Sequence, residues 1–183
     1  STTFVLTDKT GTLTQAVMSV TGILVDEGEL VTAEHFAESD QARKLLDVSL
    51  TAADAYTEEK HGTSVVHGDS VEIAVLEATA SIHVSEFENS LRSERTDYLA
   101  FTSEQRFAAG LSEVPEDGYL LCVNGAPEHI VKHATSVLRT GGREEVLHDE
   151  ARMHITQSIE QYTLQGKRLI GVGYKRVSYD DIP

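Results

Sequence analysis

The sequence predicts an α/β fold of the α+β type, in which helices flank a mostly antiparallel, twisted sheet. One observation is a pair of strand-like segments, 107–114 and 119–123, separated by the reverse-turn sequence Pro115-Glu116-Asp117-Gly118. Pro presets φ and Gly accepts a positive φ in such a turn, so the two strands should run antiparallel. The other observation is that hairpin-linked strands are interspersed with segments of helical periodicity, which favours helices packed against the sheet.

The composition fits one folded domain and excludes several classes of protein. The chain has 183 residues, of which 40% are hydrophobic, enough to build a core. Lys and Arg number 15 against 30 Asp and Glu, and the resulting charge of −15 argues against nucleic-acid binding. The single cysteine, Cys122, excludes an internal disulfide and favours a reducing compartment. No stretch approaches the roughly 18 apolar residues of a membrane span, so we expect that the chain is not membrane-inserted. We also expect it to be a monomer.

The first third of the chain predicts short strands followed by a broken helix. Residues 3–6 are typical of a short buried strand, and the β-branched segment 17–25 of one or two strands. The cluster Asp26-Glu27-Gly28-Glu29 then turns the chain. Residues 33–56 favour a helix with one break near Ser39-Asp40, because they contain many Ala and neither Gly nor Pro. Because the chain opens directly on an apolar segment and stops at Pro183, we interpret it as part of a longer protein.

The middle of the chain continues with a polar loop at 57–68 and a helix from Ser70 to about His83. Asp69 is suited to cap this helix, whose apolar positions recur every three or four residues and therefore face a core. A further strand is predicted at 98–102.

The last third predicts two helices and a final strand. Pro127 opens a short helix that runs to about Ala134, at a position where its missing N–H costs nothing. Asp149 is a plausible N-cap for a longer helix that ends at Gln165, with Gly166 as its C-terminal cap. Residues 168–177 form the last predicted strand.

The segment that carries chemistry is Asp8-Lys9-Thr10-Gly11-Thr12-Leu13-Thr14, directly after the first strand. A carboxylate at a strand end, followed by hydroxyl residues and a Gly that lets backbone N–H groups approach a phosphate, suits covalent phosphoryl transfer to Asp8. An isolated Asp in such a place would more often belong to a polar loop. Seven fixed residues, however, match by chance on the order of once in a billion positions.

This heptapeptide resembles the phosphorylation motif of the P-type ATPases, ion pumps that form an aspartyl phosphate from ATP. Further segments are similar to the nucleotide-binding domain of the cation pumps of this family. They are Gly68-Asp69-Ser70-Val71-Glu72-Ile73-Ala74, Phe101-Thr102-Ser103-Glu104-Gln105-Arg106, Asn124-Gly125-Ala126-Pro127-Glu128, which is similar to KGAPE, and Gly166-Lys167-Arg168-Leu169-Ile170.

The resemblance implies a nucleotide-binding domain at 17–177, preceded by a stub of the phosphorylation domain at 1–16 and followed by a return hinge at 178–183. Asp8 would be the phosphorylated nucleophile, assisted by Lys9, Thr10 and Thr12, with Mg²⁺ held by Asp8 and Thr10. The partners would be the remaining phosphorylation, actuator and transmembrane domains of a pump, and the location the cytoplasmic face of a membrane. The TGD and GDGxND segments of the family do not occur here. We therefore expect this chain to bind ATP without hydrolysing it.

The resemblance also assigns residues to the nucleotide. Phe101 would stack on adenine, Glu72 would accept a hydrogen bond from its amino group, and Ile170 would form an apolar wall. Arg106 and Arg168 would contact the phosphates, and Gly125 and Ala126 would leave room for the base or ribose. Each residue also has an interpretation that needs no nucleotide. Phe101 and Ile170 would be core residues, and Arg106 and Arg168 solvated surface residues. Glu72 would be a first-turn Glu that favours the helix dipole, and Gly125 and Ala126 small residues at a helix entry.

Two departures keep other functions open. The resemblance also places Asn124 among the nucleotide-binding residues. It stands where the family usually has Lys and keeps hydrogen bonding without the positive charge, so Asn124→Lys should tighten ATP binding. One alternative is a non-catalytic nucleotide-sensing or interaction module that has lost binding. Another is a soluble phosphatase of the haloacid-dehalogenase type. Such enzymes carry a second Asp two positions after the nucleophile, where this chain has Thr10.

Overall fold

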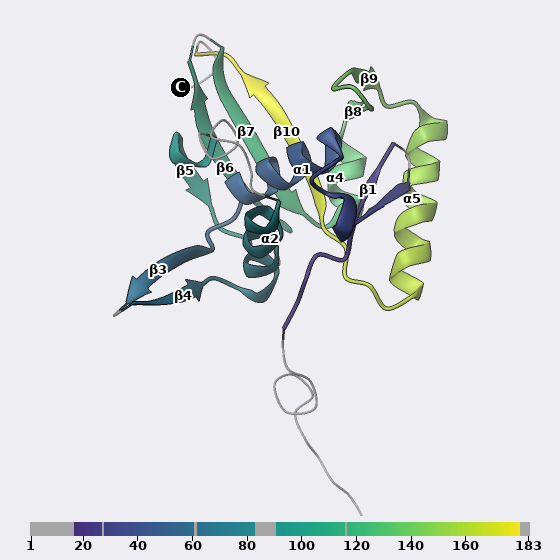
Figure 1. The fold of residues 1–183 in the computed structure, drawn as a ribbon. Coiled ribbons are helices and arrows are strands. Elements are labelled where there is room, and N and C mark those ends of the chain that lie inside the picture. The colour runs from purple at the N-terminus through teal and green to yellow at the C-terminus, as the bar shows by residue number, and fades with distance from the viewer. Residues whose placement is uncertain (1–16, 27, 61, 83–90, 116, 180–183) are drawn as a thin grey trace, which may run out of the picture.

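The computed structural model describes residues 17–26, 28–60, 62–82, 91–115 and 117–179. Its central element is a four-stranded antiparallel sheet with the strand order β10-β7-β6-β5 (Figure 1). These strands are β5 (Arg95–Leu99), β6 (Phe107–Val114), β7 (Gly118–Gly125) and β10 (Gly171–Val177). The combination of helices with antiparallel pairing confirms the predicted α+β fold.

Small hairpins and helices surround this sheet. The hairpins join β1 (Gly22–Val25) to β2 (Glu29–Thr32), β3 (Tyr56–Lys60) to β4 (Thr63–His67), and β8 (Ser136–Leu138) to β9 (Glu144–Val146). The helices are the 3₁₀ helix η1 (Ala33–His35) and the α-helices α1 (Asp40–Thr51), α2 (Ser70–Ser81), α4 (Pro127–His133) and α5 (Asp149–Leu164).

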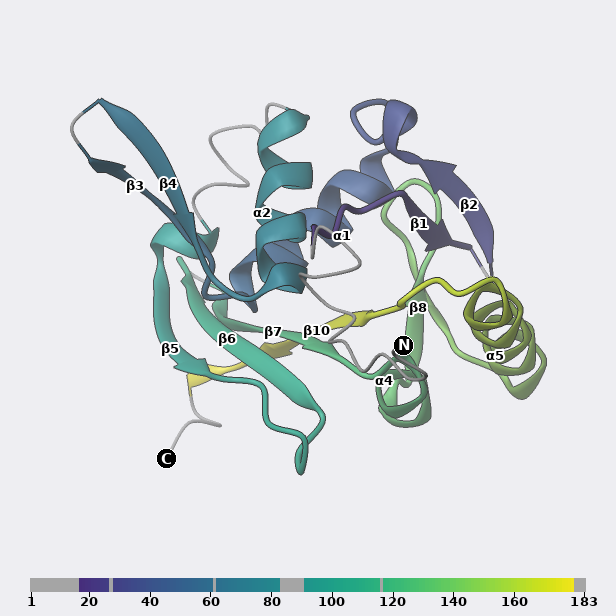
Figure 2. The ribbon, with the colours of Figure 1, turned by 90° about the horizontal axis from the view of Figure 1, so that it is seen from below.

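Helix α1 is the buried centre of the molecule. Figure 2 shows α1 and α2 on the same side of the sheet. Toward the sheet, Val48 and Ala52 pack with Leu120 and Cys122 of β7. Elsewhere α1 contributes to a second cluster, formed by Ile23, Phe36, Ala42, Leu46 and Ile82. Because apolar groups lie on both sides, residues 46–51 are all buried, as in a helix that runs through a core and not over a surface.

The start of α1 confirms the predicted break, but its end does not follow the prediction. The Ser39 hydroxyl accepts a hydrogen bond from Ala42 N–H at 3.2 Å, which caps the helix after the short η1 turn. The helix ends at Thr51, whereas the sequence predicted helix as far as Tyr56, which instead begins β3. The Ala-rich segment 52–55 has high helix propensity, but tertiary contacts to its carbonyl groups end the helix earlier.

The prediction of a loop at 57–68 is wrong, because this segment forms most of the β3–β4 hairpin. The hairpin projects away from the body of the molecule (Figure 2), and most of its side chains are exposed. A strand that faces water on both sides shows no alternation of apolar and polar residues, so periodicity could not reveal it. Strands β2, β8 and β9 were not predicted either, because each has only three or four residues, too few to show a period of two.

Helix α2 begins as predicted, and α5 ends as predicted. The Asp69 carboxylate accepts hydrogen bonds from Val71 N–H and Glu72 N–H, at 2.7 and 3.0 Å. At the end of α5, Gly166 has a φ of +76°, and Lys167 N–H donates to Tyr162 carbonyl at 3.1 Å, a Schellman cap. Asp149 is not the N-cap of α5, because His148 occupies that position and Asp149 is the first helical residue.

Strand boundaries differ from the predicted ones at several places. Residues 17–21 lie outside β1, and β5 lies earlier than the predicted 98–102. Residues 168–170 precede β10 instead of belonging to it. Strand β6 matches its prediction, and β7 extends the predicted 119–123 by one residue before and two after. The predicted strand at 3–6 lies outside the described residues.

The close approach of α1 to the sheet gives a test of this packing. A Cβ at Gly110 of β6 would lie 2.2 Å from the Thr51 carbonyl oxygen, so Gly110→Ala must push α1 away. We expect a loss of about 1–3 kcal/mol in the free energy of unfolding, measured by urea denaturation. Gly173→Ala on β10 is the control, since its Cβ would meet Ile130 at an ordinary 3.5 Å. Equal stability of the two variants would contradict this packing.

Candidate functional site

Most of the predicted nucleotide residues meet at one end of the four-stranded sheet. The residue Gly125, at the end of β7, pairs with Phe107 at the start of β6 and with Gly171 at the start of β10. Phe101 lies in the connection from β5 to β6, and Ile170 directly precedes β10. Antiparallel pairing therefore brings Phe101, Gly125 and Ile170, which are far apart in the sequence, to the same end of the sheet.

The connection between β5 and β6 is an ordered turn that presents Phe101. Arg106 N–H donates to Thr102 carbonyl at 2.8 Å, and the Gln105 side-chain amide donates to the carbonyls of Ala100 and Phe107 at 2.6 and 2.8 Å. Phe101 is 50% exposed, in contrast to the core placement that an aromatic residue beside a strand usually has. A half-exposed aromatic face in a fixed turn is suited to stacking on a planar ligand.

Arg106 is exposed, but its guanidinium is paired. It has a positive φ of +65° and forms a salt bridge with the Glu128 carboxylate in the first turn of α4. The pKa of Glu128 lies below its usual value, owing first to its own backbone N–H and then to Arg106. Both side chains are about half exposed, so the pair contributes little to stability and can exchange for another anion.

Gly125 and Ala126 join the sheet to α4. Ala126 N–H donates to Arg106 carbonyl at 3.0 Å, and Ala126 carbonyl accepts from the N–H groups of His129 and Ile130. A Cβ at Gly125 would lie 2.8 Å from the Arg106 carbonyl oxygen and 2.9 Å from the Phe107 Cβ. The space beside Gly125 is thus filled by the protein itself, and packing alone accounts for glycine at this position.

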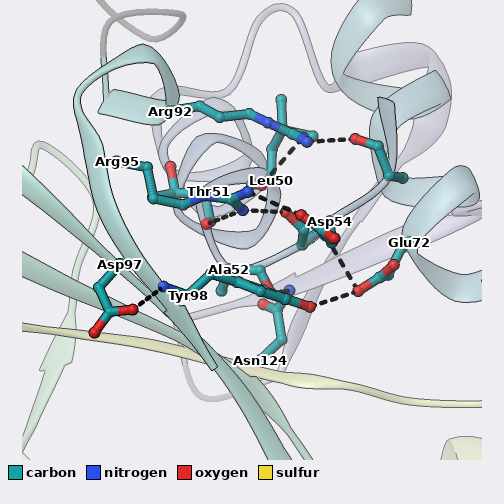
Figure 3. A network of polar contacts seen from close by, with 12 residues as sticks. Leu50, Thr51, Ala52, Asp54, Glu72, Arg92, Arg95, Asp97, Tyr98 and Asn124 are labelled. Atoms are coloured by element: carbon teal, nitrogen blue, oxygen red, sulfur yellow. Dashed lines mark hydrogen bonds and ion pairs between the residues drawn. The ribbon is translucent and has the colours of Figure 1, made fainter. Parts of the chain in front are cut away.

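Glu72 reaches the same region from the first turn of α2. Its Oε1 accepts hydrogen bonds from Asp54 N–H at 3.2 Å and from the Tyr98 hydroxyl of β5 at 3.1 Å (Figure 3). Burial, together with Glu72, raises the pKa of Tyr98 to about 12, so the phenol keeps its proton even in alkaline solution. The sequence did not single out Tyr98 or Asp54, because their contacts span distant parts of the chain.

Two arginines that the sequence did not single out donate hydrogen bonds to carbonyl groups at the C-terminal end of α1. Arg95 donates to the carbonyls of Thr51 and Ala53 at 3.4 and 2.6 Å, and to the Asp54 carboxylate at 2.9 Å. Arg92 donates to the carbonyls of Leu50 and Ala55 (Figure 3). Burial lowers the pKa of Arg92 from its ordinary value, and the positive charge of Arg95 lowers it further.

Arg168 and Ile170 lie at the border of a hollow that adjoins this sheet end, since Pro127 and Gly171, the partner of Gly125, also line it. Arg168 is exposed and Ile170 half-buried. Both line a groove of about 610 Å³, whose walls include Val20, Ile23, Leu45, Ile130, Ile155 and Ile159. The groove is mostly apolar, and neither Glu72 nor Phe101 lines it. Asp8, Lys9, Thr10 and Thr12, the predicted catalytic residues, lie outside the described residues.

Comparison with known proteins identifies the family. The model of the P-type ATPase cytoplasmic domain N matches residues 41–183. The chain belongs to this family. The N domain is also similar to the calcium-transporting ATPase lmo0841 of Listeria monocytogenes, with 27% identity over 98% of this chain and 20% of the relative. It is 25% identical to the calcium-transporting ATPase 1 of Bacillus cereus, over 100% of this chain and 20% of the relative.

A third relative transports different ions, according to its name. The sodium/potassium-transporting ATPase subunit alpha of Hydra vulgaris is 24% identical over 100% of this chain and 19% of its own length. The chain therefore spans about a fifth of the length of these relatives. Within the described residues of this N domain, no helix combines the length and apolarity that a membrane crossing requires.

Asn124 of this N domain faces α1, in the same direction as Cys122 two residues earlier. Its amide donates to the carbonyls of Ser49 and Ala52 at 2.7 and 3.4 Å. Its Oδ1 is buried, and in the described part of the chain no donor reaches it. The Asn124 side chain thus closes the end of α1 together with Arg92 and Arg95, a role that the sequence did not predict.

This role gives a prediction for Asn124→Ala. The variant leaves the carbonyls of Ser49 and Ala52 without the amide donor, and we expect it to lose about 1–3 kcal/mol of stability in urea denaturation. Gln157→Ala on the exposed face of α5 removes a similar amide and should change stability by no more than about 0.5 kcal/mol. A loss no larger than that of the control would show that Asn124 does not support α1.

Proposed function

We propose that this chain is the ATP-binding domain of a cation-transporting P-type ATPase, which delivers the γ-phosphate of ATP to Asp8 and so drives ion transport. The family membership supports this proposal. The observation that carries it is the grouping of a half-exposed Phe101 and the exposed Arg106 in the ordered connection between β5 and β6, at one end of the sheet.

The residues present fit a nucleotide. Phe101 would stack on adenine, while Glu72 would use Oε2 to accept a hydrogen bond from the adenine amino group, because both protein donors bind its Oε1. Arg106 would exchange the Glu128 carboxylate for a phosphate, and Arg168 would supply a second cation. Ile170 would cover the base from its apolar side. Asn124 would stay with α1, so it takes the place of the family Lys without supplying its charge.

The phosphoryl acceptor would be Asp8. Asp8 and Thr10 offer oxygen ligands, the type that Mg²⁺ prefers. Bound Mg²⁺ would screen the phosphate charges during transfer. Lys9 and Thr12 would contribute a cation and a hydroxyl group beside the nucleophile. The chain by itself would bind ATP without turnover, since it has no TGD or GDGxND segment to complete the catalytic site.

Stacking gives the first test of this proposal. By isothermal titration calorimetry we expect the wild-type chain to bind ATP, and Phe101→Ala to weaken binding by about tenfold to a hundredfold, since a base stack contributes about 1–3 kcal/mol. Tyr179→Ala is the control, because Tyr179 is 48% exposed but follows the opposite end of β10. No ATP binding by the wild type, or equal affinity of the two variants, would contradict the assignment.

Turnover gives an independent test. After incubation with ATP labelled at the γ-phosphate and Mg²⁺, we expect no hydroxylamine-sensitive label on the isolated chain above the level of Asp8→Asn. The physical reason is that a nucleophile without its full set of charged partners gains little stabilisation of the transition state. Substantial Mg²⁺-dependent label on Asp8 would show that the chain transfers phosphate unaided.

A further inference from the structure

We propose that Tyr98 is a positioning residue that orients Glu72 toward the amino group of adenine and thereby sets a preference for ATP over GTP. This inference rests on the proposed function, because it assumes that Glu72 reads the base. Tyr98 lies on β5, and its hydroxyl donates to Glu72 Oε1 at 3.1 Å across 26 residues of sequence (Figure 3).

The Tyr98 ring is itself held in place. Its strand partner in the register is Gly110, which has no side chain. The Arg95 guanidinium carbon lies 4.7 Å from the centre of the ring, a cation–π contact. Because Arg95 is tied to the carbonyls of Thr51 and Ala53, the ring is fixed to the end of α1.

The second donor to Glu72 depends on the same arginine. Asp54 N–H donates to Glu72 Oε1 at 3.2 Å, and the Asp54 carboxylate accepts from Arg95 at 2.9 Å. Two donors on one oxygen fix the rotation of the carboxylate, so its other oxygen points in a defined direction. A group held in its binding geometry loses less conformational entropy when the ligand arrives.

The orientation of Glu72 matters because both purines can offer donors to a carboxylate. Adenine carries an amino group at position 6, where guanine carries an oxygen acceptor. A fixed Oε2 that meets position 6 accepts from adenine and repels the oxygen of guanine. A carboxylate that is free to turn can instead meet the N1–H and the 2-amino group of guanine. Loss of Tyr98 should therefore reduce discrimination more than it reduces overall affinity.

The test compares Tyr98→Phe with the matched control Tyr174→Phe. Tyr174 is a second tyrosine of the sheet whose hydroxyl donates to a glutamate, Glu144, at 2.6 Å. Calorimetric titration with ATP and with GTP gives the ratio of the two dissociation constants. We expect Tyr98→Phe to reduce the preference for ATP by about tenfold, through loss of a hydrogen bond to a charged group. The control should keep the wild-type ratio.

A third variant separates positioning from general loosening of the fold. If Tyr98 acts through Glu72, then Glu72→Gln should lower the preference, and adding Tyr98→Phe should lower it little further. Additive losses would overturn the inference. An unchanged ratio in Tyr98→Phe would also overturn it, while leaving the proposed function intact. A wild type that binds both nucleotides equally would overturn the inference as well, whereas a wild type that binds neither would overturn the proposed function itself.

A measurement on the unmodified chain covers the case in which Tyr98→Phe does not fold. With tyrosines labelled by ¹³C at the carbon that bears the hydroxyl, we expect saturating ATP to shift the Tyr98 resonance and to leave that of Tyr174 in place. GTP at the same occupancy should shift Tyr98 less. Equal shifts of Tyr98 with both nucleotides, or none with ATP, would contradict the inference.

Discussion

The buried carboxyl end of α1 is the constraint on which the rest of this structure depends. A helix leaves its last four carbonyl groups without partners inside the helix. Because α1 ends in the core, solvent cannot supply hydrogen bonds to these carbonyl groups. Side chains from distant parts of the chain meet this need: Arg92, Arg95 and Asn124 donate to carbonyls between Ser49 and Ala55. Each buried carbonyl left unpaired would cost about 1–3 kcal/mol.

The same side chains also hold part of the candidate site in place. Arg95 fixes Asp54 and stacks on Tyr98, and these two residues hold Glu72. The side chain that would read the base is therefore connected to the core through two contacts. The turn that bears Phe101 is fixed separately, by Gln105 and by the pairing of β6 with β7. Base recognition would thus rest on fixed elements of the fold, and the proposed phosphate contacts would rest on exposed arginines.

The net charge of the chain accounts for this difference between the proposed base contacts and the proposed phosphate contacts. A chain with a net charge of −15 repels an anionic ligand at long range, so its cations must act locally. Arg92 and Arg95 are committed to carbonyl groups, whereas Arg106 and Arg168 are exposed and would be available to phosphates. The exposed pair of Arg106 with Glu128 is weak enough to open in exchange for a more highly charged partner. A stacking contact at Phe101 would add affinity that long-range repulsion does not reduce.

The sequence predicted those parts of the fold that have a local signal. The antiparallel pairing of β6 with β7, the cap at Asp69 and the strand at 107–114 each follow from neighbouring residues, and the motifs around Phe101 and Gly125 lie at the same end of the sheet. The predictions failed where the deciding contact was distant or where side chains faced water. Arg95 and Thr51 are separated by 44 positions, so no local pattern could show that they meet or that α1 ends there. Strands β3 and β4 are exposed and lack alternation.

The location of the bound nucleotide tests this account most directly. Backbone amide shifts can be followed by NMR while a nonhydrolysable ATP analogue is added to the chain. The account predicts that the largest changes fall on residues 101–106, on Gly125 and Ala126, and on the first turn of α2. Changes centred instead on the apolar groove, at Val20, Ile155 and Ile159, or no saturable change, would contradict it.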